Sequence, residues 1–167
     1  MADIEKVKMN KSGSHVRNYK KTGGNHMEHN YELVKDIWQN AEMSKDIIGK
    51  LIKICDDSNF RASLAEEFAQ YHEVAAEAKT IIEDKGYPVR PKRSAKTAVM
   101  SGISVNTWFD KTSTHLAEMM VQGSIMGVID MKRALKDYPG AEDRTKKLAN
   151  KLLDTEMNNV KKCLEYV

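Results

Sequence analysis

The feature that most constrains this chain is the three- and four-residue spacing of its apolar side chains from residue 31 onwards. Side chains at that spacing share one face of an α-helix, because each residue turns the helix by about 100°. The pattern is interrupted at residues 86–91 and 138–140, where prolines lack a backbone donor and restrict the residue before them. It therefore predicts four helices, over residues 31–56, 58–86, 95–136 and 141–166.

Four such helices bury their apolar faces most simply against one another, and no strand-like alternation competes with the helical pattern. We therefore expect an all-α fold, an antiparallel four-helix bundle with a long third helix. Residues 1–29 are rich in glycine and serine and show no sustained period, which is typical of a flexible tail. The predicted organisation is a basic tail over 1–29 followed by a bundle domain over 30–167.

Charge and cysteine usage narrow the classes of function. The tail region, residues 1–30, holds six basic and three acidic side chains, so the remaining chain carries 21 of each. A neutral body has no general attraction for phosphate backbones, so nucleic acid is an unlikely partner except for weak contact by the tail. No stretch of about 18 apolar residues is present, which predicts no membrane span and a cytoplasmic protein. Cys55 and Cys163 lie within apolar stripes without metal-ligand spacing, which predicts buried free thiols.

The third helix is apolar on nearly all sides over residues 116–129. A helix of that kind needs cover on a second side, from the tail or from another subunit. We therefore expect a homodimer formed through this helix.

Candidate site residues are the ionisable side chains that interrupt the apolar stripes. Glu156 lies one turn from apolar neighbours on both sides, Glu118 follows His115 by one turn on the third helix, and Glu67 lies at the edge of the second stripe. A buried carboxylate needs a cation, a donor or a proton beside it. Plainer interpretations remain open: Glu156 as a core carboxylate bonded to Tyr71 or His115, Glu118 with His115 as an ion pair or solvent-facing, and Glu67 as a solvated flank.

This combination of helices and inward carboxylates over residues 31–166 resembles the ferritin-like superfamily, as does the run from Asp110 to Met120. The resemblance implies a bundle that binds two iron or manganese ions through glutamates and ExxH pairs. Gln70 and Asn159 stand where the histidines of those pairs would be. The resemblance therefore implies a reduced metal site formed by Glu67, His115, Glu118 and Glu156, with iron or manganese as the expected ion.

Two functions follow from these expectations. The first is a metal-binding bundle that uses those four ligands, and the second is a non-catalytic interaction or assembly module with no metal. An enzyme that uses an inward Glu and His for proton transfer is a further hypothesis, and no spacing in the sequence names its substrate.

Overall fold

The computed structural model describes residues 25–88 and 110–167, and every regular element in those ranges is an α-helix. The prediction of an all-helical bundle is confirmed for this part of the chain. Residues 95–109, predicted to begin the third long helix, lie outside it. The helices are α1 (His26–Ile54), α2 (Ser58–Asp84), α4 (Ser113–Asp137) and α5 (Asp143–Cys163).

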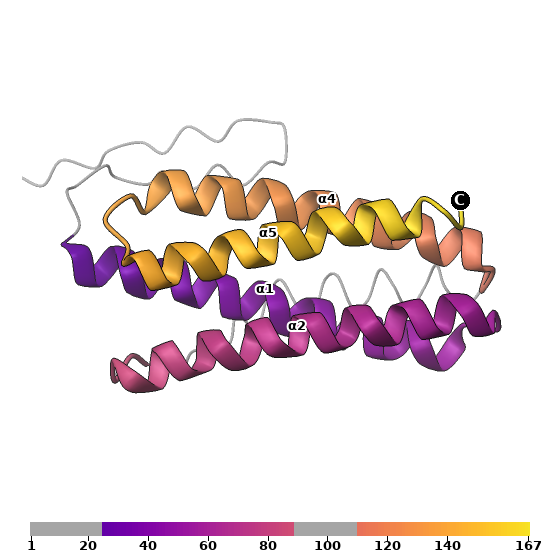
Figure 1. Ribbon diagram of the computed structural model, residues 1–167, viewed down its shortest axis with the longest axis horizontal. Helices are drawn as coiled ribbons and strands as arrows, with labels where there is room; N and C mark the ends of the chain where they lie inside the picture. Colours follow the sequence, from indigo (N-terminus) through magenta and orange to yellow (C-terminus); the bar gives the residue numbers. More distant parts are fainter. Residues whose placement is uncertain (1–24, 89–109) are drawn as a thin grey trace, which may run out of the picture.

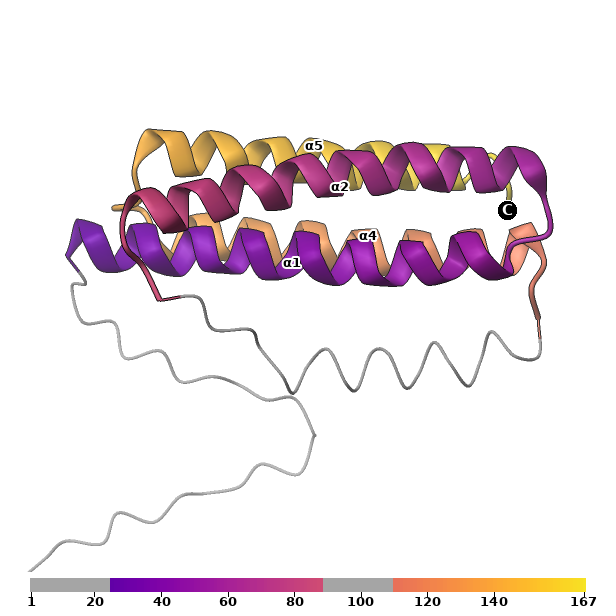
Figure 2. The ribbon, with the colours of Figure 1, turned by 90° about the horizontal axis from the view of Figure 1, so that it is seen from below.

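The helices form two hairpins packed as two layers, α1 with α2 and α4 with α5 (Figure 1; Figure 2 gives the perpendicular view). The end of α2 lies beside the start of α1, where Tyr87 Oη donates to the carbonyl of Met27 over 3.4 Å. The start of α4 lies at the opposite end, beside the C-terminus, where Thr114 Oγ1 donates to the carbonyl of Tyr166 over 2.9 Å. Helices α2 and α4 therefore run in the same direction, and the end of α2 and the start of α4 lie at opposite ends of the bundle.

Side-chain caps fix the starts of α1, α2 and α4. Asp57 accepts from the backbone amide of Phe60 and so caps α2. Thr112 caps α4 through its hydroxyl, and Asn25 caps α1. Each cap accepts a hydrogen bond from one of the amides that a helix start leaves without an intrahelical partner.

Helix α1 begins at His26, five residues before the predicted start, because its first turn is anchored to the far hairpin. His26 and His29 each form a hydrogen bond of 2.9 Å with the backbone of Gly140, in the loop between α4 and α5. A Cβ on Gly140 would lie 2.7 Å from His29 Nδ1, so the close approach requires glycine. Residues 26–29 therefore belong to the bundle and not to the tail.

The core follows the predicted stripes closely. Helices α1, α2 and α5 bury the apolar side chains that the three- and four-residue spacing selected, and the buried set also includes both cysteines as free thiols. Its largest side chains that are less than 2% exposed are Tyr71, Phe60, Leu33, Ile37, Ile48, Leu51, Leu64, Ile81, Ile82, Leu116, Met131 and Leu148.

Ion pairs along the exposed seam between α2 and α5 set the alignment of these two helices. The pairs run in antiparallel order, so that residues late in α2 meet residues early in α5. Each is solvent-exposed and individually weak, and together they disfavour a shift of one helix along the other. They are Asp84 with Arg144, Glu77 and Glu73 with Lys151, and Glu66 with Lys162, with Lys85 and Glu142 just beyond the helix ends.

Candidate functional site

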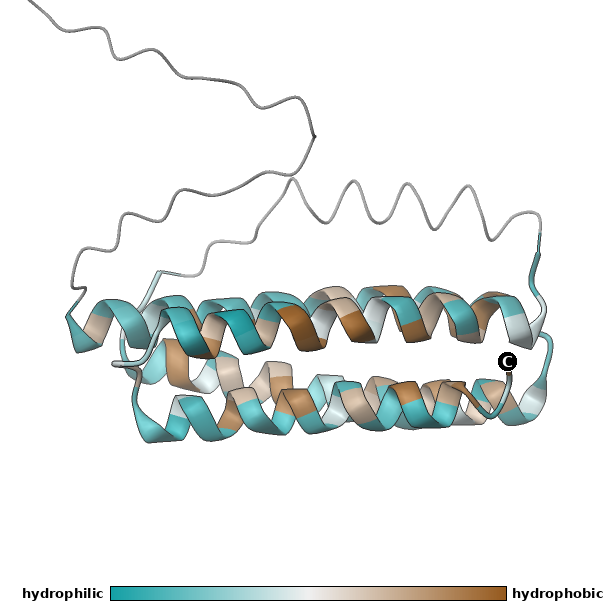
Figure 3. Cartoon of the chain, turned by 90° about the horizontal axis from the view of Figure 1, so that it is seen from above, coloured by the Kyte–Doolittle hydropathy of each residue, from teal (hydrophilic) through white to brown (hydrophobic). Residues whose placement is uncertain are grey.

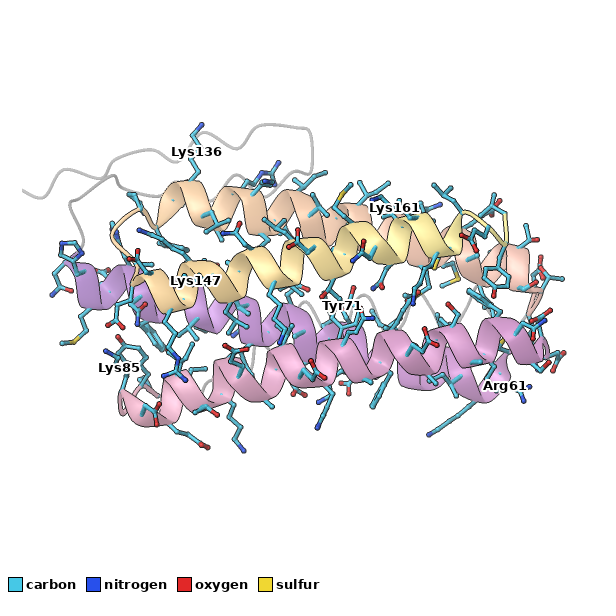
Figure 4. All side chains as sticks on the ribbon, in the orientation of Figure 1. Arg61, Tyr71, Lys85, Lys136, Lys147 and Lys161 are labelled. Atoms are coloured by element: carbon cyan, nitrogen blue, oxygen red, sulfur yellow. The ribbon has the colours of Figure 1, made fainter. Side chains whose placement is uncertain are left out.

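Polar side chains from α2, α4 and α5 meet inside the otherwise apolar core, and we call this group the polar core cluster. No member is more than 3% exposed. Figure 4 shows one of them, Tyr71, at mid-length of the bundle between α2 and α5. The cluster consists of Glu67 and Tyr71 from α2, Ser124 from α4, and Glu156, Asn159 and Cys163 from α5.

The centre of the cluster is a chain of hydrogen bonds through Tyr71. Its Oη donates to Glu156 Oε2 over 2.6 Å and accepts from Asn159 Nδ2 over 2.8 Å. Because the amide can only donate at that nitrogen, the phenol proton has to point to the carboxyl group. The side chain of Ser124 on α4 lies close to both Tyr71 and Glu156, so the cluster brings three helices together.

One turn along the bundle, Glu67 forms a second, less complete part of the cluster. The thiol of Cys163 donates to Glu67 Oε1 over 3.7 Å, a long and weak bond. Glu67 Oε2 and Asn159 Oδ1 are both buried without a hydrogen-bond partner among the described residues. A buried acceptor without a donor lowers the stability of the fold. Protonation of a carboxyl group, or binding of a cation beside these oxygens, would therefore stabilise the cluster.

Burial dominates the acid–base behaviour of the cluster. It raises the pKa of Glu67 to about 7, against a smaller opposing effect of the bond from Cys163. It also raises the pKa of Glu156 to about 7, although the hydrogen bond from Tyr71 and the nearby Ser124 side chain stabilise the charged form. Burial, and then the neighbouring charge of Glu67, raises the pKa of the Cys163 thiol to about 12. Both carboxyl groups therefore change charge near neutral pH, while the thiol stays protonated.

A glycine on α4 makes room for the buried carboxyl of Glu156. A Cβ built on Gly127 would lie 2.4 Å from Glu156 Oε1 and 2.7 Å from Glu156 Cδ. No real Cβ tolerates such contacts, so α4 can approach α5 this closely only because position 127 has no side chain. Gly123, one turn earlier on α4, is exposed and has no atom within 4 Å of a built Cβ.

The four predicted ligands do not gather in one place. Glu67 and Glu156 are 0% and 2% exposed and lie in the polar core cluster, which rules out the alternative of Glu67 as a solvated flank residue. The expectation that Glu118 lies inward is wrong, because this side chain is on the exposed face of α4. His115 is half-buried near the start of α4, and its Nε2 is buried without a hydrogen-bond partner in the part of the chain that the structure describes.

The error for Glu118 has a simple geometric cause. Between Leu116 and Ile129 apolar residues occupy most positions around the helix, so the sequence set the rotation of this helix only weakly. In the structure Leu116, Ala117 and Met120 turn inward, which places Glu118 on the opposite side. The inward polar residue of α4 is instead Ser124, and Gly127 also faces inward.

The chemistry that this arrangement offers is therefore that of two carboxyls, a phenol and a thiol, without an imidazole. Within residues 25–88 and 110–167, no three His, Cys, Asp or Glu side chains are grouped as ligands for a metal ion. In the same ranges no helix is both long enough and apolar enough to cross a membrane.

Sequence reasoning anticipated part of this cluster. The bond between Glu156 and Tyr71 was one of the open alternatives for Glu156, and the structure supports it. The roles of Ser124, Asn159 and Gly127 were missed. The sequence feature that could have identified them is the spacing of small and polar residues at inward positions of α4 and α5. Those positions can be recognised as inward only when the rotation of the two helices is known.

Comparison with known proteins adds no further constraint, because no protein-family model, curated protein or solved structure matches the chain.

Proposed function

We propose that this protein is a ferritin-like helical bundle that performs no catalysis and self-associates through the outer face of α4. The ferritin-like relationship is supported by two antiparallel hairpins in which α2 and α4, the helices on either side of residues 89–109, run in the same direction, as in that fold class. In this proposal the polar core cluster occupies the place of the metal centre and aligns the helices through hydrogen bonds.

The observation that carries the proposal is the apolar surface on α4. Ile125, Met126 and Ile129 are 46%, 65% and 44% exposed although the core beneath them is already filled. Met157 of α5, which follows Glu156 in the sequence, is also a large apolar side chain that is 45% exposed. We call these four side chains the α4 patch, and Figure 3, which views the molecule from this side, shows hydrophobic segments along the middle of α4.

Contiguous apolar surface of this kind on a charged protein marks an interaction site. The charged residues of α4 lie toward its two ends, and Ser113–Asp137 holds no charged side chain between Glu118 and Asp130. Four large apolar side chains form a small interface, which favours a weak and reversible association over an obligate one.

A comparison of two matched variants tests this function. Ile125→Asp places a charge in the α4 patch, whereas Met27→Asp places the same charge at a 68%-exposed apolar residue at the start of α1. We expect size-exclusion chromatography with light scattering to show a concentration-dependent dimer for the unaltered chain and for Met27→Asp, and a monomer for Ile125→Asp. Equal association of all three proteins would refute the proposal. Circular dichroism would show whether both variants keep the bundle folded.

A metal-binding bundle is the second candidate, and the unpartnered Oε2 of Glu67 favours it. A cation beside this atom would satisfy a buried acceptor that otherwise has none, and Glu156 supplies a second carboxyl in the same cluster. Oxygen-rich ligation suits iron or manganese. The ligands in this version are Glu67 and Glu156, without Glu118.

Elemental analysis separates the two candidates. Metal-binding predicts near-stoichiometric iron or manganese in protein purified without chelator, lost in Glu156→Ala and retained in Glu118→Ala, which alters only an exposed side chain. Protein that contains no transition metal even after loading would remove this candidate and leave the assembly function.

A further inference from the structure

The outer face of α4 carries an ordered pattern of charge as well as apolar surface. Glu118, Gln122, Ile125, Ile129 and Arg133 follow one another at four- and three-residue spacing, and all are exposed. Residues at this spacing form one continuous stripe along a helix. The stripe therefore begins with a carboxylate, continues through apolar side chains, and ends with a guanidinium.

Glu118 and Arg133 are available for contacts outside the bundle. Glu118 is exposed and forms no hydrogen bond or ion pair with another side chain within residues 25–88 and 110–167. Arg133 contacts Asp130 over 3.8 Å, with the two side chains 73% and 68% exposed, which is a solvated pair of little strength. Neither charge is needed to hold the four helices together.

From this stripe we infer that two copies of the chain pair through α4 in antiparallel orientation, about a two-fold axis between Ile125 and Met126. In that register Gln122 lies opposite Ile129 of the second copy, and Glu118 lies opposite Arg133 of the second copy. The two-fold axis generates each contact twice, as an isologous interface requires. This inference rests on the proposed self-association and adds the orientation and the charged contacts.

The opposite orientation is disfavoured by the same charges. A parallel pairing places Glu118 against Glu118 and Arg133 against Arg133. The opposite charges would then lie roughly 22 Å apart along the helix, at about 1.5 Å for each residue. That separation exceeds the screening length of about 8 Å at physiological salt, so only the repulsion would remain. The charges therefore select the antiparallel dimer.

Charge reversal tests the register. We expect Glu118→Lys and Arg133→Glu to weaken dimerisation by about tenfold each, because each places like charges opposite one another twice in the dimer. The double variant carrying both changes should recover most of the lost affinity. Glu83→Lys makes the same charge change on exposed α2, in the other hairpin, and should leave the dimer unchanged.

Cysteine cross-linking tests directly whether the two α4 helices of the dimer are antiparallel. Glu118→Cys mixed with Arg133→Cys should give a disulfide-linked heterodimer under mild oxidation, while each variant alone should not cross-link through this position. The native thiols are buried and do not compete.

The outcomes separate the register from the proposed function. Loss of the dimer in Ile125→Asp, combined with no response to charge reversal or with homodimer cross-linking of Glu118→Cys, would overturn the antiparallel register and leave self-association standing. A chain that stays monomeric at all concentrations would overturn both, and would indicate that residues 89–109 or another protein cover the α4 patch.

Discussion

Replacing Gly127 by alanine is the sharpest test of how the core of this bundle is built. Alanine is the better helix former by about 1 kcal/mol, so Gly→Ala in an open helix stabilises a protein. At position 127 the new methyl group would lie 2.4 Å from Glu156 Oε1, and α4 or the carboxyl has to move. The outcome therefore depends on whether the buried carboxyl occupies the place described.

The change in the free energy of unfolding that Gly127→Ala causes is the sum of two destabilising effects and one stabilising effect. Overpacking a filled core costs about 1–3 kcal/mol, and displacing Glu156 leaves the phenol of Tyr71 without its acceptor, which costs about 1–3 kcal/mol more. The helix-propensity gain offsets about 1 kcal/mol of this. We expect Gly127→Ala to lower the free energy of unfolding by about 1–5 kcal/mol.

Gly123→Ala is the matched control, because it lies one turn away on the same helix in open space. It should raise the free energy of unfolding by about 0.5–1 kcal/mol. Urea denaturation followed by circular dichroism measures both variants. Equal stability of the two would show that Glu156 does not pack against α4, and the description of the polar core cluster would fail.

A double-mutant cycle tests whether contact with Glu156 is the reason why Gly127→Ala destabilises the protein. Glu156→Ala removes the carboxyl that the methyl group meets, so Gly127→Ala should cost much less in that background. A cost that is unchanged by the loss of Glu156 would mean that the methyl group disturbs the helix in some other way.

Three further predictions concern the same cluster. Glu67 has a folded-state pKa of about 7 against 4.5 for the free group, so its protonated form favours folding. Its contribution is fully present below about pH 4.5 and is lost as the pH rises to about 7, with a total of about 3 kcal/mol; in urea titrations between pH 5 and 8, Glu67→Gln should show a smaller decline, with the part due to Glu156 remaining. Tyr71→Phe should cost about 2–4 kcal/mol by urea denaturation, because it leaves a buried carboxyl oxygen and a buried amide without partners, whereas Tyr31→Phe, which loses one exposed bond, should cost much less. Cys55 and Cys163 should resist a thiol reagent in the native protein and react only on unfolding, since both are buried and both thiol pKa values are raised; rapid reaction of either thiol at neutral pH would contradict its placement.

The sequence predicted the helices well because their apolar periods are long and strong. The stripe that includes Leu33, Ile37 and Leu51 is fully buried, and the stripe of α2 is buried through Glu67 and Tyr71. Helix ends were less predictable, because they depend on tertiary contacts such as those of His26 and His29 with the loop at Gly140. No local propensity encodes a contact between residues more than 100 positions apart.

The candidate site was predictable only where one helix carries a clear polar face. Glu156 lies in an apolar stripe on the strongly amphipathic α5, so its burial followed from the pattern alone. The rotation of α4 did not follow, because a helix that is apolar on most sides has no preferred face until its neighbours are placed. The choice between Glu118 and Ser124 as the inward polar residue therefore required the structure.

The proposed function requires that the chain associates with itself through the α4 patch without a metal ion. Sedimentation equilibrium of the unaltered chain in the presence of a chelator, from about 5 to 500 µM, measures this directly. We predict a reversible monomer–dimer equilibrium with a single dissociation constant. A monomer across the whole range, or a dimer that forms only when iron or manganese is added, would contradict it.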